Sequence, residues 1–195
     1  GVNASDQVTA ADADVALTAL TDSRILSGTI GVAGSGQAAG DLTVYGNLIT
    51  STTEAVVAGG STVRAGGWVA LNASDESQIT SAGLSIAGSG NAAASIVGAA
   101  NVITNAVRAQ AVGSTVRAGA HAYPASETET IPGVGLRLRV VSDADILAFA
   151  GSVAGSGSGA GVLLLTGNVI ANTTEAGILE EIFKDQEGIV VATVG

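Results

Sequence analysis

The sequence predicts an all-β fold, a right-handed parallel β-helix (β-solenoid) built of three repeats of about 54 residues. Three observations predict it. One five-residue string occurs three times in the chain, apolar and polar residues alternate within each repeat, and glycine is abundant, at 28 of 195 residues, while only 3% are aromatic. A β-sandwich is the alternative for a chain of short strands and glycine turns, but a sandwich does not require in-register copies of one pattern.

The repeats are defined by two markers that keep the same spacing. The string Val-Ala-Gly-Ser-Gly at 32–36 returns at 86–90, where it begins with Ile, and at 153–157, which gives offsets of 54 and 67 residues. Asn47, Asn101 and Asn168 recur with the same two offsets. We therefore predict one solenoid segment over residues 1–195, with repeats at about 15–68, 69–122 and 136–188. The extra residues form an insertion at 123–135, which contains both prolines and is predicted to be a surface loop.

Alternating apolar residues indicate half-buried strands. Val15, Leu17 and Ala19 follow this period, and so do the equivalent residues from Leu136 to Val140. A 54-residue unit divides into three coils of about 18 residues, so about ten stacked coils are expected. Ladders of Val, Ile, Leu and Ala would fill their interior, with Ser, Thr, Asn and Gly outside. Val32, Ile86 and Val153 are predicted to occupy equivalent interior positions, and residues 176–184 to form a helical turn or cap.

Composition excludes several functional classes. The formal net charge of −10 opposes binding to nucleic acid and to an anionic membrane surface. The chain has no cysteine, which excludes disulfides and thiolate metal sites. No apolar stretch approaches the roughly 18 residues that would cross a bilayer, and residues 1–6 show no secretion signal. We expect no cofactor and no membrane insertion.

The strings at 61–67, 151–162 and 168–176 carry a family resemblance. They read Ser-Thr-Val-Arg-Ala-Gly-Gly, Gly-Ser-Val-Ala-Gly-Ser-Gly-Ser-Gly-Ala-Gly-Val and Asn-Val-Ile-Ala-Asn-Thr-Thr-Glu-Ala. The chain resembles the large filamentous adhesins and leukotoxin-like exoproteins of Gram-negative bacteria that are exported by two-partner secretion. This resemblance implies an adhesive passenger segment, secreted or at the bacterial cell surface and associated with virulence, with no catalytic residues to carry over. The insertion and residues 183–187 depart from the pattern.

Three repeated features are assigned structural roles. The Gly-Ser-Gly strings lack the lysine of a phosphate-binding loop and are interpreted as tight turns with glycine at positive φ. Asn47, Asn101 and Asn168 are expected to form a hydrogen-bonded ladder. Glu54, Arg108 and Glu175 share one repeat position, so small salt bridges are expected there.

Acidic residues gather near one strand of each repeat, and calcium binding is an alternative because calcium favours oxygen ligands. Their spacing matches neither an EF-hand nor a Gly-rich nonapeptide, so solvated acidic turns are the favoured interpretation. The residues are Asp12, Asp14, Asp22, Asp75, Glu76, Asp143 and Asp145.

The insertion carries the candidates for chemistry and for binding. A carbohydrate-active β-helix enzyme, a polysaccharide lyase or hydrolase, is the alternative function, and it would use His121, Arg117, Glu127 and Glu129. His121 is the only histidine and the seven basic residues are scattered over the repeats, so we favour a chain that is not an enzyme. Loops on a rigid scaffold concentrate distinct chemistry. We therefore expect a glycan or a host-cell surface to contact Trp68, His121, Tyr123, Glu127 and Glu129, and the open solenoid ends to associate end to end.

Overall fold

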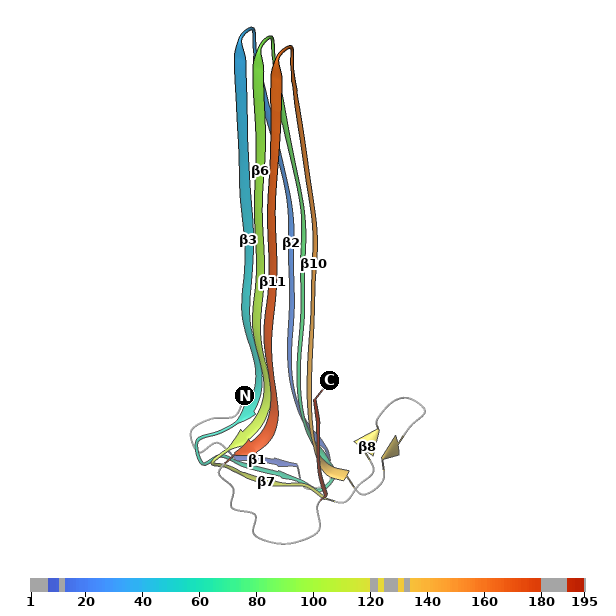
Figure 1. Cartoon of the computed structure of the whole chain (residues 1–195). Coiled ribbons are helices and arrows are strands. Elements are labelled where there is room, and N and C mark those ends of the chain that lie inside the picture. The colour runs from blue at the N-terminus through green and yellow to red at the C-terminus, as the bar shows by residue number, and fades with distance from the viewer. Residues whose placement is uncertain are drawn as a thin grey trace.

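The computed structural model describes residues 7–10, 13–119, 123–124, 130–131, 134–179 and 189–194, and it places side chains over 7–10, 13–119 and 135–179. All the regular structure in these ranges is β-strand. The long strands stand side by side on a base of short ones (Figure 1). The strands are β1 (Gln7–Ala10), β2 (Val15–Ser35), β3 (Ala38–Val57), β4 (Thr62–Ala65), β5 (Val69–Ser89), β6 (Ala92–Val112), β7 (Thr115–Arg117), β8 (Tyr123–Pro124), β9 (Thr130–Ile131), β10 (Val134–Ser156), β11 (Gly159–Leu179) and β12 (Ile189–Val194).

Each repeat forms one coil of the solenoid. A long strand runs to the distal tip, a tight turn reverses it, a second long strand returns, and a short strand closes the base (Figure 1). Equivalent residues of successive repeats are hydrogen-bonded neighbours, so Val15 pairs with Val69 and Val69 with Leu136. The repeat alignment is therefore confirmed. The predicted three coils per repeat are wrong, because one coil takes all 54 residues.

Three parallel sheets result from this stacking. They are β2–β5–β10 with β12 added at the base, β3–β6–β11, and the short β1–β4–β7. Strands of 21 residues make a shaft about 70 Å long. β12 places Val190 beside Leu136, one further step of 54 residues, and so begins a fourth coil. The insertion contributes an antiparallel pair, β8 with β9, which Figure 1 shows standing away from the shaft beside the base.

The apolar core lies at the base of the shaft, where the three sheets meet. Val15, Val69 and Leu71 from one sheet pack with Val57 from the second and Val63 from the short third sheet. The predicted inward alternation from Val15 to Ala19 and from Leu136 to Val140 is correct here. A smaller cluster follows further up the shaft, formed by the buried residues Ile49, Ile79 and Ile103.

The distal interior is small and polar, which corrects the expected aliphatic filling. Ser85, Ser95 and Asn101 are fully buried between the two long sheets. The Ser85 and Ser95 hydroxyl oxygens lie 2.5 Å apart, so the two sheets approach closely. Small side chains permit this approach, and hydrogen bonds between the sheets compensate for the loss of water.

The outer faces of the distal shaft carry the aliphatic residues, again opposite to expectation. Val32, Ile86 and Val153 are equivalent in register, but they are 71%, 37% and 57% exposed. Side chains alternate strictly along a strand. Val32 lies 17 residues after Val15 in one continuous strand, so it must point to the opposite face from Val15.

The tip turns need glycine for space and not for backbone conformation. A Cβ on Gly90 would overlap the carbonyl oxygen of Gly36, and one on Gly157 would overlap that of Gly90. The positive-φ glycines of the described chain are Gly59, Gly60 and Gly113, at the base. The predicted positive φ in the Gly-Ser-Gly strings is therefore wrong. The predicted helical turn is also wrong over 176–179, which belong to β11, and its remaining residues lie outside the described chain.

Candidate functional site

Trp68 lies at the base of the shaft, immediately before β5. Its side chain is half-buried, its amide donates to Asp14 Oδ1 at 2.8 Å, and its carbonyl accepts from the amide of Val15 at 2.9 Å. These bonds fix the tryptophan backbone to the preceding coil. The 54-residue offset of the repeats aligns Trp68 with Asp14, in agreement with this contact.

The other predicted contact residues are not brought together by the described structure. Tyr123 belongs to the β8–β9 pair, opposite Ile131, and its side chain is not described. His121, Glu127 and Glu129 lie outside the described residues. Arg117, the basic member of the alternative enzyme site, is exposed at the end of β7. Both the binding set and the enzyme set therefore depend on residues that lie outside the described part of the chain.

The three repeated asparagines form a continuous ladder in the interior of the shaft. Asn47 Nδ2 donates to Asn101 Oδ1 at 2.7 Å, and Asn101 Nδ2 donates to Asn168 Oδ1 at 2.9 Å. Asn47 Nδ2 also donates to Ser27 Oγ at 2.9 Å, which ties the ladder to the facing sheet. Every amide donates in the same direction, from the first coil toward the third.

A second ladder crosses the outer face of β3–β6–β11. Arg108 Nη1 lies 2.8 Å from Glu54 Oε1, and Arg108 Nε lies 2.9 Å from Glu175 Oε2. These hydrogen bonds, that to Glu54 first and that to Glu175 second, raise the pKa of the Arg108 guanidinium above its ordinary value. The Arg108 guanidinium of the second coil thus links the carboxylates of the first and third coils, as the Glu-Arg-Glu alternation predicts.

The acidic residues do not form a calcium site within the part of the chain that the structure describes, where no three potential metal ligands gather. Asp22, Glu76, Asp143 and Asp145 are exposed as expected, and Asp12 lies outside the described residues. Asp75 is the exception, because its side chain points inward and is fully buried. The prediction of a solvated acidic turn is wrong for this residue.

Neutral donors surround the Asp75 carboxylate. Ser51 Oγ donates at 2.5 Å, Asn105 Nδ2 at 2.6 Å and Ser77 Oγ at 2.8 Å. A buried charge normally needs a partner ion or several hydrogen bonds, and here the hydrogen bonds supply the stabilisation. The arrangement connects two coils and both long sheets.

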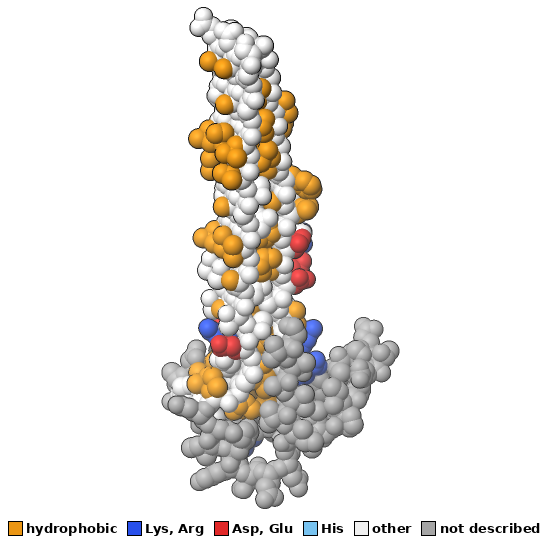
Figure 2. Space-filling model, viewed as in Figure 1, with side chains coloured by type: hydrophobic (Ala, Val, Ile, Leu, Met, Phe, Trp, Pro, Cys, Tyr) orange, Lys and Arg blue, Asp and Glu red, His pale blue; other side chains and the backbone are white. Residues whose placement is uncertain are grey.

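The outer surface of the distal shaft is apolar, a feature that the sequence-based predictions did not include. Figure 2 shows hydrophobic side chains grouped along the shaft, while the charged side chains in view lie in its lower half. Leu26 and Ile30 on β2 are 85% and 73% exposed, and Leu42 on β3 is 68% exposed. The sequence contains a signal for this surface, because odd and even positions of one strand face opposite sides. The aliphatic residues of β2 are at odd positions at Val15 and Leu17 and at even positions from Leu26 onward.

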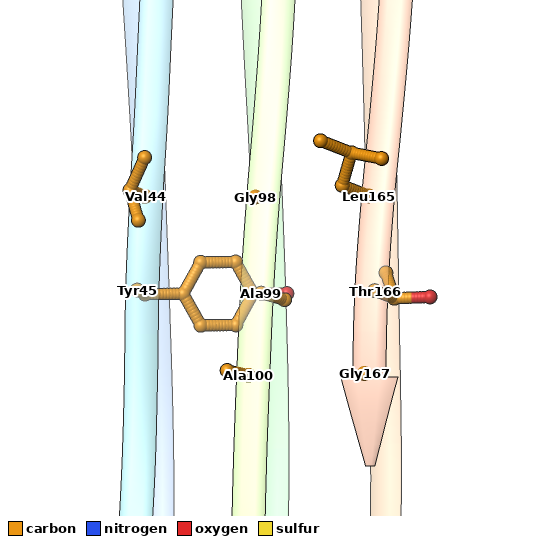
Figure 3. Close-up of a pocket in the computed structure, with 8 residues that line it drawn as sticks. All are labelled: Val44, Tyr45, Gly98, Ala99, Ala100, Leu165, Thr166 and Gly167. Carbon is orange, nitrogen blue, oxygen red and sulfur yellow. The ribbon is translucent and has the colours of Figure 1, made fainter.

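A shallow apolar hollow of about 300 Å³ lies on this surface (Figure 3). Val44, Gly98 and Leu165 occupy equivalent positions on β3, β6 and β11. Gly98 has no side chain, so the surface dips between its two neighbours. The lining contains no ionisable side chain apart from Tyr45, whose hydroxyl donates to the backbone oxygen of Phe149 at 2.8 Å in the other sheet. The hollow can accept an aliphatic group.

No protein-family model, no curated protein and no solved structure matches the chain. Within the described residues, no helix is long and apolar enough to cross a membrane.

Proposed function

We propose that this chain is a structural and adhesive segment of a secreted or cell-surface bacterial repeat protein of the filamentous adhesin kind. The observation that carries the proposal is the continuous shaft, in which each pair of long strands keeps one register over about 20 residues. Parallel stacking with buried hydrogen-bonded ladders makes a rigid spacer, because every coil is paired along its length. A spacer of this kind holds a contact region at a fixed distance from its anchor.

Adhesive contact is assigned to the base, at Trp68 and the insertion that contains β8 and β9. The repeated faces offer similar groups at every coil, whereas a loop that differs from the repeats provides distinct chemistry. A half-buried tryptophan supports this assignment, since an indole presents both an apolar face for a sugar ring and a hydrogen-bond donor. In this proposal the shaft holds the base in position, and the residues of the base contact the receptor.

The test measures binding of the full chain to a glycan array and to host-cell surfaces. Trp68→Ala is expected to weaken binding about tenfold or more, because truncating an aromatic anchor commonly costs that much. Leu26→Gln is the matched control, since Leu26 is 85% exposed on the shaft and far from the base. If Trp68→Ala binds as the parent does and Leu26→Gln loses binding, contact lies on the shaft and the assignment to the base is wrong. If the parent binds no surface tested, the adhesive role itself is contradicted.

A further inference from the structure

In the part of the chain that the structure describes, the two ends of the solenoid present long sheet edges. Among the described strands, β2 and β3 pair only with β5 and β6 at one end, and β11 pairs only with β6 at the other. Proteins usually protect such edges by shortening them, by adding proline or lysine, or by a bulge. β11 has 21 residues in unbroken register, with no proline, no lysine and Glu175 as its one charged residue. A row of backbone donors and acceptors is therefore free to pair.

The Asn ladder makes the two ends complementary. Because each amide donates toward the third coil, Asn168 Nδ2 is a donor without an acceptor at one end, and Asn47 Oδ1 is an acceptor without a donor at the other. A neighbour that continues the stack satisfies both groups. The same register places aliphatic residues side by side, Leu147 with Leu26 and Leu163 with Leu42. Within the chain, Ile96 already lies beside both Leu42 and Leu163.

We propose that copies of this chain stack end to end, with β2 and β3 of one copy adding in parallel to β10 and β11 of another. The junction continues the 54-residue register, so Asn47 of the second copy follows Asn168 of the first. The contact joins different surfaces of the two copies and leaves both outer ends open, so it generates a filament. This inference rests on the coil register and stands independently of the adhesive role proposed above.

β12 occupies part of the edge that the second copy uses. It pairs along the basal end of β10, from Val134 to Val140, where the first residues of β2 of the docking copy, 15–19, would lie. The second copy replaces it, because the docking strands offer 21 and 20 residues against the six of β12. The greater number of backbone hydrogen bonds favours the exchange.

Charges at the junction weaken the stack. Within the chain, Arg108 separates Glu54 from Glu175, but at the junction Glu175 lies beside Glu54 of the next copy. Asp143 likewise meets Asp22, while Asp145 meets Arg24 in a favourable pair, because the middle-coil partners of these residues share the same rows. Like charges directly opposite on neighbouring strands are destabilising and are screened by salt. Association is therefore expected to strengthen as salt is added.

The first test is sedimentation velocity of the full chain over a range of concentration and salt. Glu175→Gln and Asp143→Asn are each expected to tighten association about two- to fivefold at low salt, because each removes one like-charge contact. Glu76→Gln is the matched control: it changes net charge by the same amount, but Glu76 lies in the middle coil. Stacking is ruled out if the chain stays monomeric at every salt concentration, or if Glu76→Gln acts as strongly as Glu175→Gln.

The second test determines the register between the strands of the two copies. The chain contains no cysteine, so an introduced pair is the only possible source of a disulfide. Thr50 and Ala171 are exposed and share one row across β3 and β11, with Thr104 between them on β6. Mixing the Thr50→Cys and Ala171→Cys chains under oxidation is expected to give a disulfide-linked dimer, since neighbouring strands suit disulfide geometry. Mixing Thr50→Cys with Thr104→Cys is the control and should give none, because Thr104 would lie two strand spacings, about 9.6 Å, from Thr50 of the next copy. Equal cross-linking in both mixtures would overturn the register.

Discussion

At the scale of single residues, burial in this shaft is decided by strand parity and by hydrogen bonding more than by side-chain polarity. Asp75 is fully buried among hydroxyl and amide donors, while Leu26 is 85% exposed. The sequence predicts the facing of Val15 and Leu17 because they follow strict alternation. The prediction fails at Val32 because it assumed turns between Val15 and Val32. A turn would have allowed both side chains to face the interior, whereas one continuous strand does not.

Asp75 provides a test of the buried network. Asp75→Ala removes the acceptor of the buried Ser77 hydroxyl and one of the two acceptors of the buried Asn105 amide, so the free energy of unfolding should fall by about 2–4 kcal/mol. Asp75→Asn keeps one acceptor oxygen and should cost less. Urea unfolding measures both, with the exposed Asp143→Asn variant as the control. An Asp75→Ala chain as stable as the Asp143→Asn chain would contradict the network.

At the scale of elements, the sequence predicts which residues are neighbours but not how long each strand is. Asn47, Asn101 and Asn168 are neighbours because the repeat spacing requires it. Strand length was underestimated because glycines inside the strands resemble turns, and typical strands have only five or six residues. Gly83 instead lies within β5, where a Cβ would meet the ring of Tyr45. Such glycines make room for a large side chain of the facing sheet.

The tip turn can be tested with two glycines of the same strand region. Gly90→Ala should lower the free energy of unfolding by about 1–3 kcal/mol, because the new methyl group would overlap the Gly36 carbonyl oxygen and the stacked turns would have to separate. Gly88→Ala should change stability by less than about 0.5 kcal/mol, since no atom lies within 4 Å of its Cβ position. Thermal unfolding of the two variants measures the difference. Equal destabilisation by both would show that the turns are not closely stacked.

At the scale of the whole molecule, repetition predicts the solenoid, and physical chemistry explains its reversed interior. The gap between the two long sheets holds mainly Ser, Asn and Ala side chains, with Tyr45 and the cluster of Ile49, Ile79 and Ile103 as its larger members, and most other aliphatic side chains lie outside or at the base. Composition alone could not show this, because an inward Ser and an outward Leu give the same composition as the reverse. The arrangement of the candidate binding set could not be predicted either, since the insertion departs from the repeats and its residues have no equivalents in the other coils.

The most direct test of this account is whether one repeat makes one coil. Thr50 and Thr104 are exposed partners on β3 and β6, one repeat apart, and the strand spacing places them about 4.8 Å from each other. The double variant Thr50→Cys/Thr104→Cys should form an intramolecular disulfide readily under mild oxidation, in a chain that remains monomeric and folded. Three coils per repeat would instead separate the two positions by about 14 Å and forbid the bond. Failure of the folded double variant to cross-link would contradict the 54-residue coil.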